Sequence, residues 1–194
     1  MKSKFKYLID QRSIRMFFLG FSAGLPLLLV FSTLSVWLTK ADIERSTITL
    51  FSWVGFAYSF KFLWTPIVDH FKLPFSDNFG HRKSWLFFSQ VMIISSLILA
   101  SFSDPNLSLF FMVISFILIA FSSATQDIVI DAFRIESVSQ KLQGALSSMY
   151  LAGYRIAMIV SGAGSLWFVS IQSGETYLLD SWQFVYRVMA LFMI

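Results

Sequence analysis

Cysteine is absent from this chain of 194 residues, which excludes a disulfide framework, a thiolate metal site and a thiol nucleophile. Charged residues are scarce, at 13% of the sequence, whereas a soluble domain carries about 25%. The two histidines, His70 and His81, fall in one basic segment. Zinc-protease, nucleophile-elbow and phosphate-loop motifs are also missing. We therefore expect neither an enzyme nor a bound metal or cofactor.

Hydrophobic residues make up 56% of the chain, and 23 of the residues are phenylalanine. This composition is typical of a protein whose side chains face lipid. The net charge of +4 raises the question of a nucleic-acid partner. The lysines and arginines, however, lie mostly in short segments between apolar runs. We therefore expect the lipid bilayer, and no nucleic acid, as the partner.

The apolar runs predict an all-α fold, a polytopic membrane helix bundle. We expect a basic tail at residues 1–13, then spans at 14–38, 48–69, 85–103, 107–133, 143–170 and 182–194. The first run is too long for a signal-peptide core, so it is expected to remain as a membrane anchor. The sixth run offers only 13 residues, so we expect a sixth helix that is truncated.

Basic residues alternate between the two sides of the predicted membrane topology. One side carries ten of them: Lys2, Lys4, Lys6, Arg12, Arg15, Lys72, Arg82, Lys83, Arg134 and Lys141. The other side carries only Lys40 and Arg45. Because positively charged loops stay in the cytoplasm, this asymmetry predicts a cytoplasmic N-terminus.

Lys61, Asp127, Asp131 and Arg155 are four charged residues that lie within the predicted spans. A charge at a helix centre costs roughly 3 kcal/mol on insertion scales, so such residues usually pair or line a polar path. With a rise of 1.5 Å per residue, Lys61 and Arg155 lie about 4 Å and 3 Å from the centres of their spans. Asp127 lies about 10 Å from the centre of its span, and Asp131 follows one turn later near the interface.

Each of these groups has a structural and a functional interpretation. Asp131 fits an interfacial carboxylate, and Asp127 fits either an ion pair or a group that binds an amine or a proton. A carboxylate that alternates between dry and cation-rich surroundings couples proton movement to a shape change. Lys61 and Arg155 fit structural pairing and anion binding equally well. Gln126 points about 100° away from Asp127 and fits a bond to either substrate or a neighbouring helix.

Aromatic and small residues add two weaker signals. Tyr58 and Trp64 flank Lys61 at positions i−3 and i+3, which would place them near its face and allow a sugar to stack on them. Gly20 and Gly24 form a G-x-x-x-G pattern, whose usual role is close packing of membrane helices.

The end of the second predicted span resembles the loop signature of the major facilitator superfamily. Asp69 closes that span, and Gly80, His81, Arg82 and Lys83 open the next one. A carboxylate facing cations in one loop would form a charge latch on the cytoplasmic side. The loop between them is longer than the usual form.

Four further stretches resemble the AmpG muropeptide permeases of that superfamily and, less closely, its acetyl-coenzyme A transporters. They are residues 20–26 (GFSAGLP), 61–69 (KFLWTPIVD), 123–132 (SATQDIVIDA) and 153–155 (GYR). The resemblance implies the N-terminal six-helix half of a major facilitator fold in a bacterial inner membrane.

The resemblance also implies a function, which is proton-coupled uptake of anhydro-muropeptides for cell-wall recycling. Asp127 would then couple protons or bind substrate, Gln126, Lys61 and Arg155 would line the central cavity, and Asp69 and Arg82 would form the latch. Because the family builds its site between two halves, the partner would be a C-terminal half or a second copy. Transport of another anionic solute, such as an acetyl-coenzyme A-like molecule, and a non-transporting remnant or interaction protein stay open.

Overall fold

The computed structural model describes residues 10–74, 76–136, 140–174 and 176–194, and over these ranges it contains helices and no strands. The predicted all-α membrane bundle is thereby confirmed. In the described residues, four helices are long and apolar enough to cross a bilayer. They are Gln11–Lys40, His81–Ala100, Leu109–Glu136 and Leu142–Ser173. The two other predicted spans do not form long uninterrupted helices, so their crossing of the membrane stays a prediction.

The first and fifth segments each contain one π-helical stretch. The first consists of α2 (Gln11–Leu28), the π-turn η1 (Leu29–Thr33) and α3 (Leu34–Lys40). The fifth consists of α10 (Gln140–Ile159), the π-turn η4 (Val160–Gly164) and α11 (Ser165–Ser173). The two π-turns contact each other, and the Thr33 hydroxyl donates a hydrogen bond of 2.8 Å to the Ser161 carbonyl. A π-turn displaces main-chain carbonyls from regular helical pairing, which leaves them available for such bonds.

The second segment is broken into short pieces. It runs through α4 (Arg45–Phe51), the 3-10 helix η2 (Ser52–Gly55), α5 (Phe56–Ser59), the 3-10 helix η3 (Lys61–Leu63) and α6 (Thr65–His70). Pro66 lies in the first turn of α6 and has no N–H with which to continue the preceding helix. Phe60 and Trp64 have ψ values of 10° and 0°, outside the α-helical range, on either side of Lys61. The direction of side chains therefore changes abruptly around Lys61.

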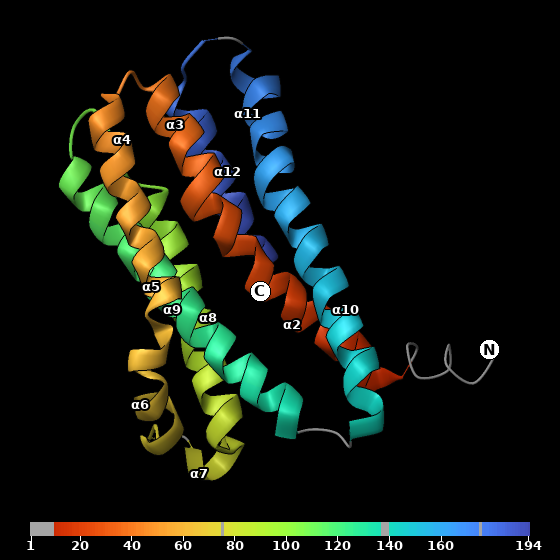
Figure 1. The fold of residues 1–194 in the computed structure, drawn as a ribbon. Coiled ribbons are helices and arrows are strands. Elements are labelled where there is room, and N and C mark those ends of the chain that lie inside the picture. The colour runs from red at the N-terminus through yellow and green to blue at the C-terminus, as the bar shows by residue number, and fades with distance from the viewer. Residues whose placement is uncertain (1–9, 75, 137–139, 175) are drawn as a thin grey trace.

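The remaining helices complete a bundle of roughly parallel rods (Figure 1). They are α7 (Ser76–Phe79), α8 (His81–Ala100), α9 (Leu109–Glu136) and α12 (Leu179–Phe192). Gly80 precedes α8 with a φ of 84°, a conformation that glycine adopts without strain. The start of α2, the short helices α6 and α7, the end of α9 and the start of α10 lie at the same end of the bundle (Figure 1). The loops that the sequence predicts to be basic and cytoplasmic are thus neighbours in space.

Helices α2 and α10 pack over their length with their backbones in close contact. A Cβ atom built on Gly20 would meet the Tyr150 backbone, and one built on Gly153 would meet the Phe17 backbone. Gly24 faces the Tyr154 backbone in the same way. The G-x-x-x-G pattern therefore serves helix packing, because only glycine permits this separation.

The hydrophobic core is largest at the end of the bundle away from α6 and α7. Trp37 and Trp182 are almost completely buried and stack with centroids 5.9 Å apart and an interplanar angle of 1°. The Tyr186 hydroxyl donates a 2.9 Å hydrogen bond to the Leu29 carbonyl of the first π-turn. This cluster holds α12 against α3 and the first π-turn.

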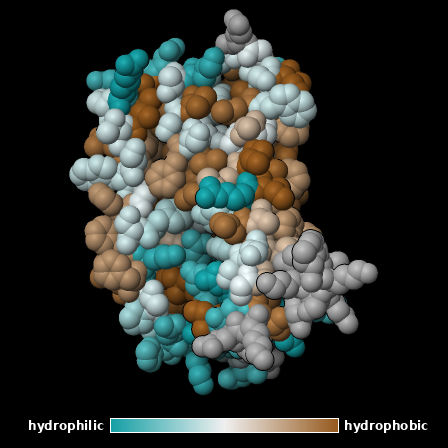
Figure 2. All heavy atoms as spheres, turned by 45° about the vertical axis from the view of Figure 1, so that its right-hand side comes forward, coloured by the Kyte–Doolittle hydropathy of each residue, from teal (hydrophilic) through white to brown (hydrophobic). Residues whose placement is uncertain are grey.

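On the face that Figure 2 shows, the surface is divided into zones by hydropathy. Hydrophilic residues gather at the two ends, and hydrophobic residues dominate the band between them, with an isolated hydrophilic patch inside that band. This division is what a bilayer imposes on a spanning protein.

Candidate functional site: a charged strip on the bundle

The centre of the candidate site is an ion pair between two helices that are far apart in the sequence. Lys61 from η3 places its Nζ atom 3.8 Å from Oδ2 of Asp127 on α9. The side chain of Asp127 is 14% exposed and that of Lys61 is 35% exposed. Two of the four predicted intramembrane charges are thus brought together, and the lysine is the more accessible of the two.

The Asp127 carboxylate is satisfied on only one side. Its Oδ1 atom is buried and accepts no hydrogen bond from any residue that the structure describes. Three tyrosines lie within electrostatic range of the carboxylate: Tyr58, Tyr150 and Tyr154. A buried carboxylate oxygen without a donor favours uptake of a proton or of a ligand N–H or O–H group.

Polar groups continue from Asp127 towards the end of α9. Arg134 pairs with Asp131 across 3.1 Å, and its guanidinium lies 5.6 Å from the centre of the Tyr150 ring. The Tyr150 and Tyr154 rings are 5.9 Å apart on successive turns of α10. We name this set the charged strip; its members are Lys61, Asp127, Asp131, Arg134, Tyr150 and Tyr154. Asp131 therefore lies one helical turn from Asp127 as predicted, and it is paired and half exposed.

Arg155 follows Tyr154 on α10, next to the charged strip, and its side chain faces outward. Its side chain is exposed, and its only recorded polar contact within the described chain is the Met158 sulfur, 3.9 Å from Nη1. Tyr154 lies within electrostatic range of both Arg155 and Asp127. The tyrosine thus connects the two charged positions.

Gln126 bonds to neighbouring helices, which is one of the two roles that the sequence left open. It is completely buried in the bundle, where its amide donates to the Ser22 hydroxyl across 3.0 Å and also contacts the Gln90 carbonyl oxygen. Ser22 in turn donates to Gln90 across 2.9 Å, and the Gln90 amide donates to the Met193 carbonyl. Its 100° offset from Asp127 turns Gln126 towards α2 and α8. Gln90 is a polar residue in an apolar helix, a sequence signal that we did not use.

Trp64 also lies away from the charged strip. Its ring stacks on Phe121 with centroids 4.8 Å apart, and its Nε1 donates to the Thr125 hydroxyl across 3.2 Å. The predicted i+3 relation to Lys61 assumed a regular helix, which η3 interrupts. Tyr58, by contrast, contacts Phe31 and remains near Asp127.

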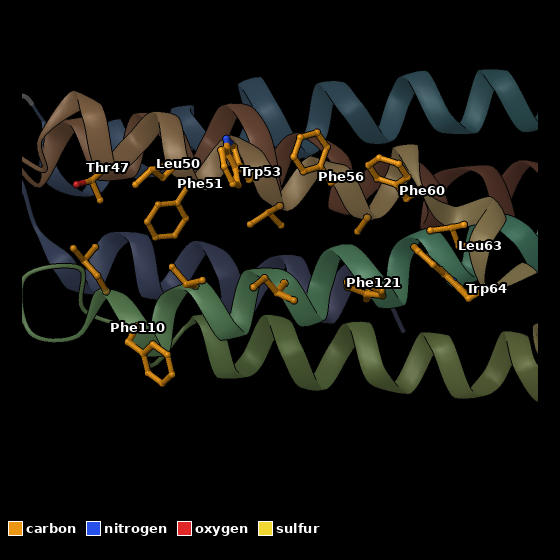
Figure 3. A pocket seen from close by; sticks show the side chains of 15 residues that line it. Thr47, Leu50, Phe51, Trp53, Phe56, Phe60, Leu63, Trp64, Phe110 and Phe121 are labelled. Carbon is orange, nitrogen blue, oxygen red and sulfur yellow. The ribbon is translucent and has the colours of Figure 1, made fainter.

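Trp64 lines a groove of about 650 Å³ between the second segment and α9 (Figure 3). The figure shows side chains from both sides converging on it, among them Phe51, Phe56, Phe60 and Phe121. No charged side chain is among its described lining residues. The groove is therefore suited to hydrocarbon and not to a charged solute.

Arg82, at the start of α8, forms the ion pair with Asp69 on which the predicted latch depends. Arg82 Nη1 lies 2.6 Å from Asp69 Oδ1, and Nη2 lies 2.9 Å from Glu136 Oε1. The arginine therefore joins the ends of α6 and α9, and Glu136 is a member that the sequence interpretation missed. Lys83 forms no ion pair with a described residue and lines a second groove of about 570 Å³ beside α2, where α12 ends.

The described residues contain no group of three or more His, Asp or Glu side chains positioned to hold a metal ion. The polar side chains thus form three groups. They are the Lys61–Asp127 ion pair, the neighbouring rings of Tyr150 and Tyr154, and the ion pairs of Arg82 at the basic end of the bundle. These are features of a membrane protein that handles a polar solute or a proton.

Comparisons with known proteins agree with this chemistry. Residues 14–105 match the sequence model of the family described as Acetyl-coenzyme A transporter 1. The chain is 38% identical to the AmpG 4 protein of Rickettsia felis over 182 residues. This aligned region covers 94% of this chain and 42% of that protein. It is also 38% identical to the anhydromuropeptide permease of Escherichia coli K12 over 195 residues. That aligned region covers 100% of this chain and 38% of the permease. The chain thus spans about two-fifths of the length of these relatives.

Proposed function

We propose, on the premise that this chain is a homologue of the AmpG permeases, that it builds part of an inner-membrane secondary transporter that takes up anhydro-muropeptides. The observation that carries the proposal is the Lys61–Asp127 pair. A partly buried charge pair within the membrane, with one buried carboxylate oxygen that accepts no hydrogen bond from the described residues, is costly unless it serves a polar path. The homology supplies the substrate class, and the structure supplies the residues.

In this proposal Asp127 carries the coupling proton. The Lys61 ammonium stabilises the ionised carboxylate, and the buried surroundings stabilise the neutral acid. Protonation of Asp127 would free Lys61, which is the more exposed partner, to meet the solute. Proton binding and solute binding are then linked through one ion pair.

The latch around Arg82 would close the cytoplasmic end in one state of the transport cycle. Asp69 and Glu136 lie at the ends of two different helical segments, so separation of those ends would break two ion pairs at once. The concentration of basic residues at this end supports a cytoplasmic N-terminus. Because the chain has no cysteine, Lys72→Cys and Lys40→Cys would each introduce a single reporter thiol. We expect an impermeant maleimide added to intact cells to label Lys40→Cys and not Lys72→Cys, and the reverse pattern would contradict the orientation.

The relatives are more than twice as long as the matched segment, and this supports a partner. A second polypeptide that supplies the remaining helices, or a second copy of this chain, would cover the charged strip. Without such a cover, Arg155 and Lys61 would face lipid, which costs roughly 3 kcal/mol for each charge. We favour a complementary half, because the transporter folds of this type place the site between two halves.

Uptake of labelled anhydro-muropeptide tests the proposal. Cells that lack their own permease would produce this chain together with the part of the Escherichia coli relative that it does not match. We expect uptake that a protonophore abolishes, that Asp127→Asn reduces by at least about tenfold, and that the exposed control Asp10→Asn leaves unchanged. Protonophore-resistant uptake, or normal uptake by Asp127→Asn at an equal protein level, would contradict proton coupling.

The family match over residues 14–105 supports a second candidate, an acetyl-coenzyme A-like solute. Competition separates the two in the same cells. Excess unlabelled acetyl-coenzyme A should leave muropeptide uptake unchanged if our first assignment is correct, and should suppress it if the site takes the nucleotide.

A further inference from the structure

The two cations in the middle of the membrane differ in what they contact. Lys61 is paired with Asp127 at 3.8 Å. Arg155 has no carboxylate within ion-pair distance anywhere in the described part of the chain, and its recorded contact is a thioether sulfur. A thioether is a weak acceptor and does not compensate a guanidinium. Of these two cations, Arg155 is therefore the one that still requires an anionic partner.

Arg155 cannot reach the membrane surface to find that partner in water. It lies about 4 Å from the middle of the stretch Leu142–Ser173, at 1.5 Å per residue. The nearest interface is about 11 Å away, which exceeds the length of an arginine side chain. Its neighbours on the outward face of α10, Leu151 and Ile159, are exposed and apolar. The charge of the Arg155 guanidinium is therefore compensated only if an anion binds to it within the membrane.

The surroundings of Arg155 favour a solute over a fixed protein carboxylate. Tyr154 adjoins it and lies within electrostatic range of Asp127, and Tyr150 continues the aromatic track towards the cytoplasmic end. Hydroxyl-bearing rings of this kind supply hydrogen bonds and stacking faces to a sugar-containing solute. A guanidinium binds a carboxylate through two parallel hydrogen bonds, a geometry that an ammonium such as Lys61 does not provide.

We infer that Arg155 binds an ionised carboxylate of the transported solute, while the Lys61–Asp127 pair handles the proton. The inference rests on the proposed transport function and adds that the two cations have separate tasks. A muropeptide carries free carboxylates on its peptide, so the solute class is chemically suitable. The site would discriminate by the charge of the solute as well as by its size.

The test compares one labelled anhydro-muropeptide with a derivative in which every carboxylate is converted to a carboxamide. With the complementary half present, we expect the wild-type chain to take up the acid form at least about tenfold better than the amide form. Arg155→Gln should lower uptake of the acid form to the level of the amide form and leave the amide form unchanged. Arg155→Lys should restore part of the difference, and Ala152→Gln, an exposed control on the same helix, should behave as wild type.

A second measurement avoids the need for transport. The acid form should raise the melting temperature of the purified complex for the wild-type chain and not for Arg155→Gln, because a ligand stabilises the state that binds it. Equal losses of both forms in Arg155→Gln, accompanied by weaker co-purification of the two halves, would overturn the inference and make Arg155 a docking residue. Normal discrimination in Arg155→Gln would also overturn it. Absence of uptake and of stabilisation in the wild type would instead refute the transport function on which it rests.

Discussion

The close contact between α2 and α10 makes Gly153 the most sensitive position for a small substitution. In Gly153→Ala the new methyl group would collide with the Phe17 carbonyl oxygen, and it would lie 2.9 Å from the Phe17 carbonyl carbon and 3.0 Å from the Phe21 amide nitrogen. Carbon atoms in ordinary contact are about 3.5 Å apart or more, so the helices must separate by more than about 0.6 Å. A gap of that size forfeits roughly a quarter of the local dispersion energy along the interface. We expect an overpacking cost of about 1–3 kcal/mol.

Gly144→Ala provides the matched control on the same helix. No atom outside its own surroundings lies within 4 Å of a Cβ at Gly144, so alanine there adds only helix propensity, about 1 kcal/mol of stabilisation. The difference between the two variants therefore isolates the cost of separating α2 from α10. The assay is the free energy of unfolding in mixed micelles, monitored by tryptophan fluorescence.

Combining the substitution with Gly20→Ala tests the reasoning further. Both methyl groups would push apart the same helix pair, so the double variant should be less destabilised than the sum of the single variants, by about 0.5 kcal/mol or more. Equal stabilities of Gly153→Ala and Gly144→Ala would refute the packing role. Strict additivity would show that the two glycines act independently.

Two further perturbations have defined outcomes. Thr33→Val removes the hydrogen bond to the Ser161 carbonyl without changing the shape of the side chain. Because a buried acceptor is left unpaired, we expect the free energy of unfolding to fall by about 1–3 kcal/mol in the same assay. A change below about 0.5 kcal/mol would contradict the coupling of the two π-turns. Arg82→Gln should reduce stability by no more than about 2 kcal/mol, since its ion pairs with Asp69 and Glu136 are partly exposed. Uptake by Arg82→Gln should nevertheless fall severalfold, and wild-type uptake by this variant would exclude the latch.

Sequence patterns predicted the features that depend on composition and regular helical geometry. Long apolar runs specified the four long helices, and the spacing of Gly20 and Gly24 specified a close helix contact. The cost of charge in lipid indicated that Lys61 and Asp127 need partners but left pairing and ligand binding open, and the structure shows that the two pair with each other. These features depend on local residue spacing or on pairs of charges, which can be recognised in a single sequence.

The features that failed depended on departures from regular helices. The placement of Trp64 beside Lys61 was wrong because η3 redirects the chain between Phe60 and Trp64. For Gln126 the sequence left a substrate and a neighbouring helix open, and the structure shows it in the core in contact with Gln90. Neither π-turn has a distinctive residue pattern, so their contact was not predictable.

The internal and external polar groups of the bundle follow different rules, and this difference is itself an argument for function. Inside, Gln126, Gln90 and Ser22 are neutral and bond to one another, and the Gln126 Oε1 atom is left without a hydrogen-bond partner among the described residues. On the outward side lie the charged groups, and there Asp127 has an oxygen without a donor and Arg155 lacks a carboxylate partner among the described residues. A protein selected only for a stable fold would remove these charges, because replacing them by apolar residues is often stabilising. Their presence on the outward side, and not in the core, therefore indicates that what completes them comes from outside this chain.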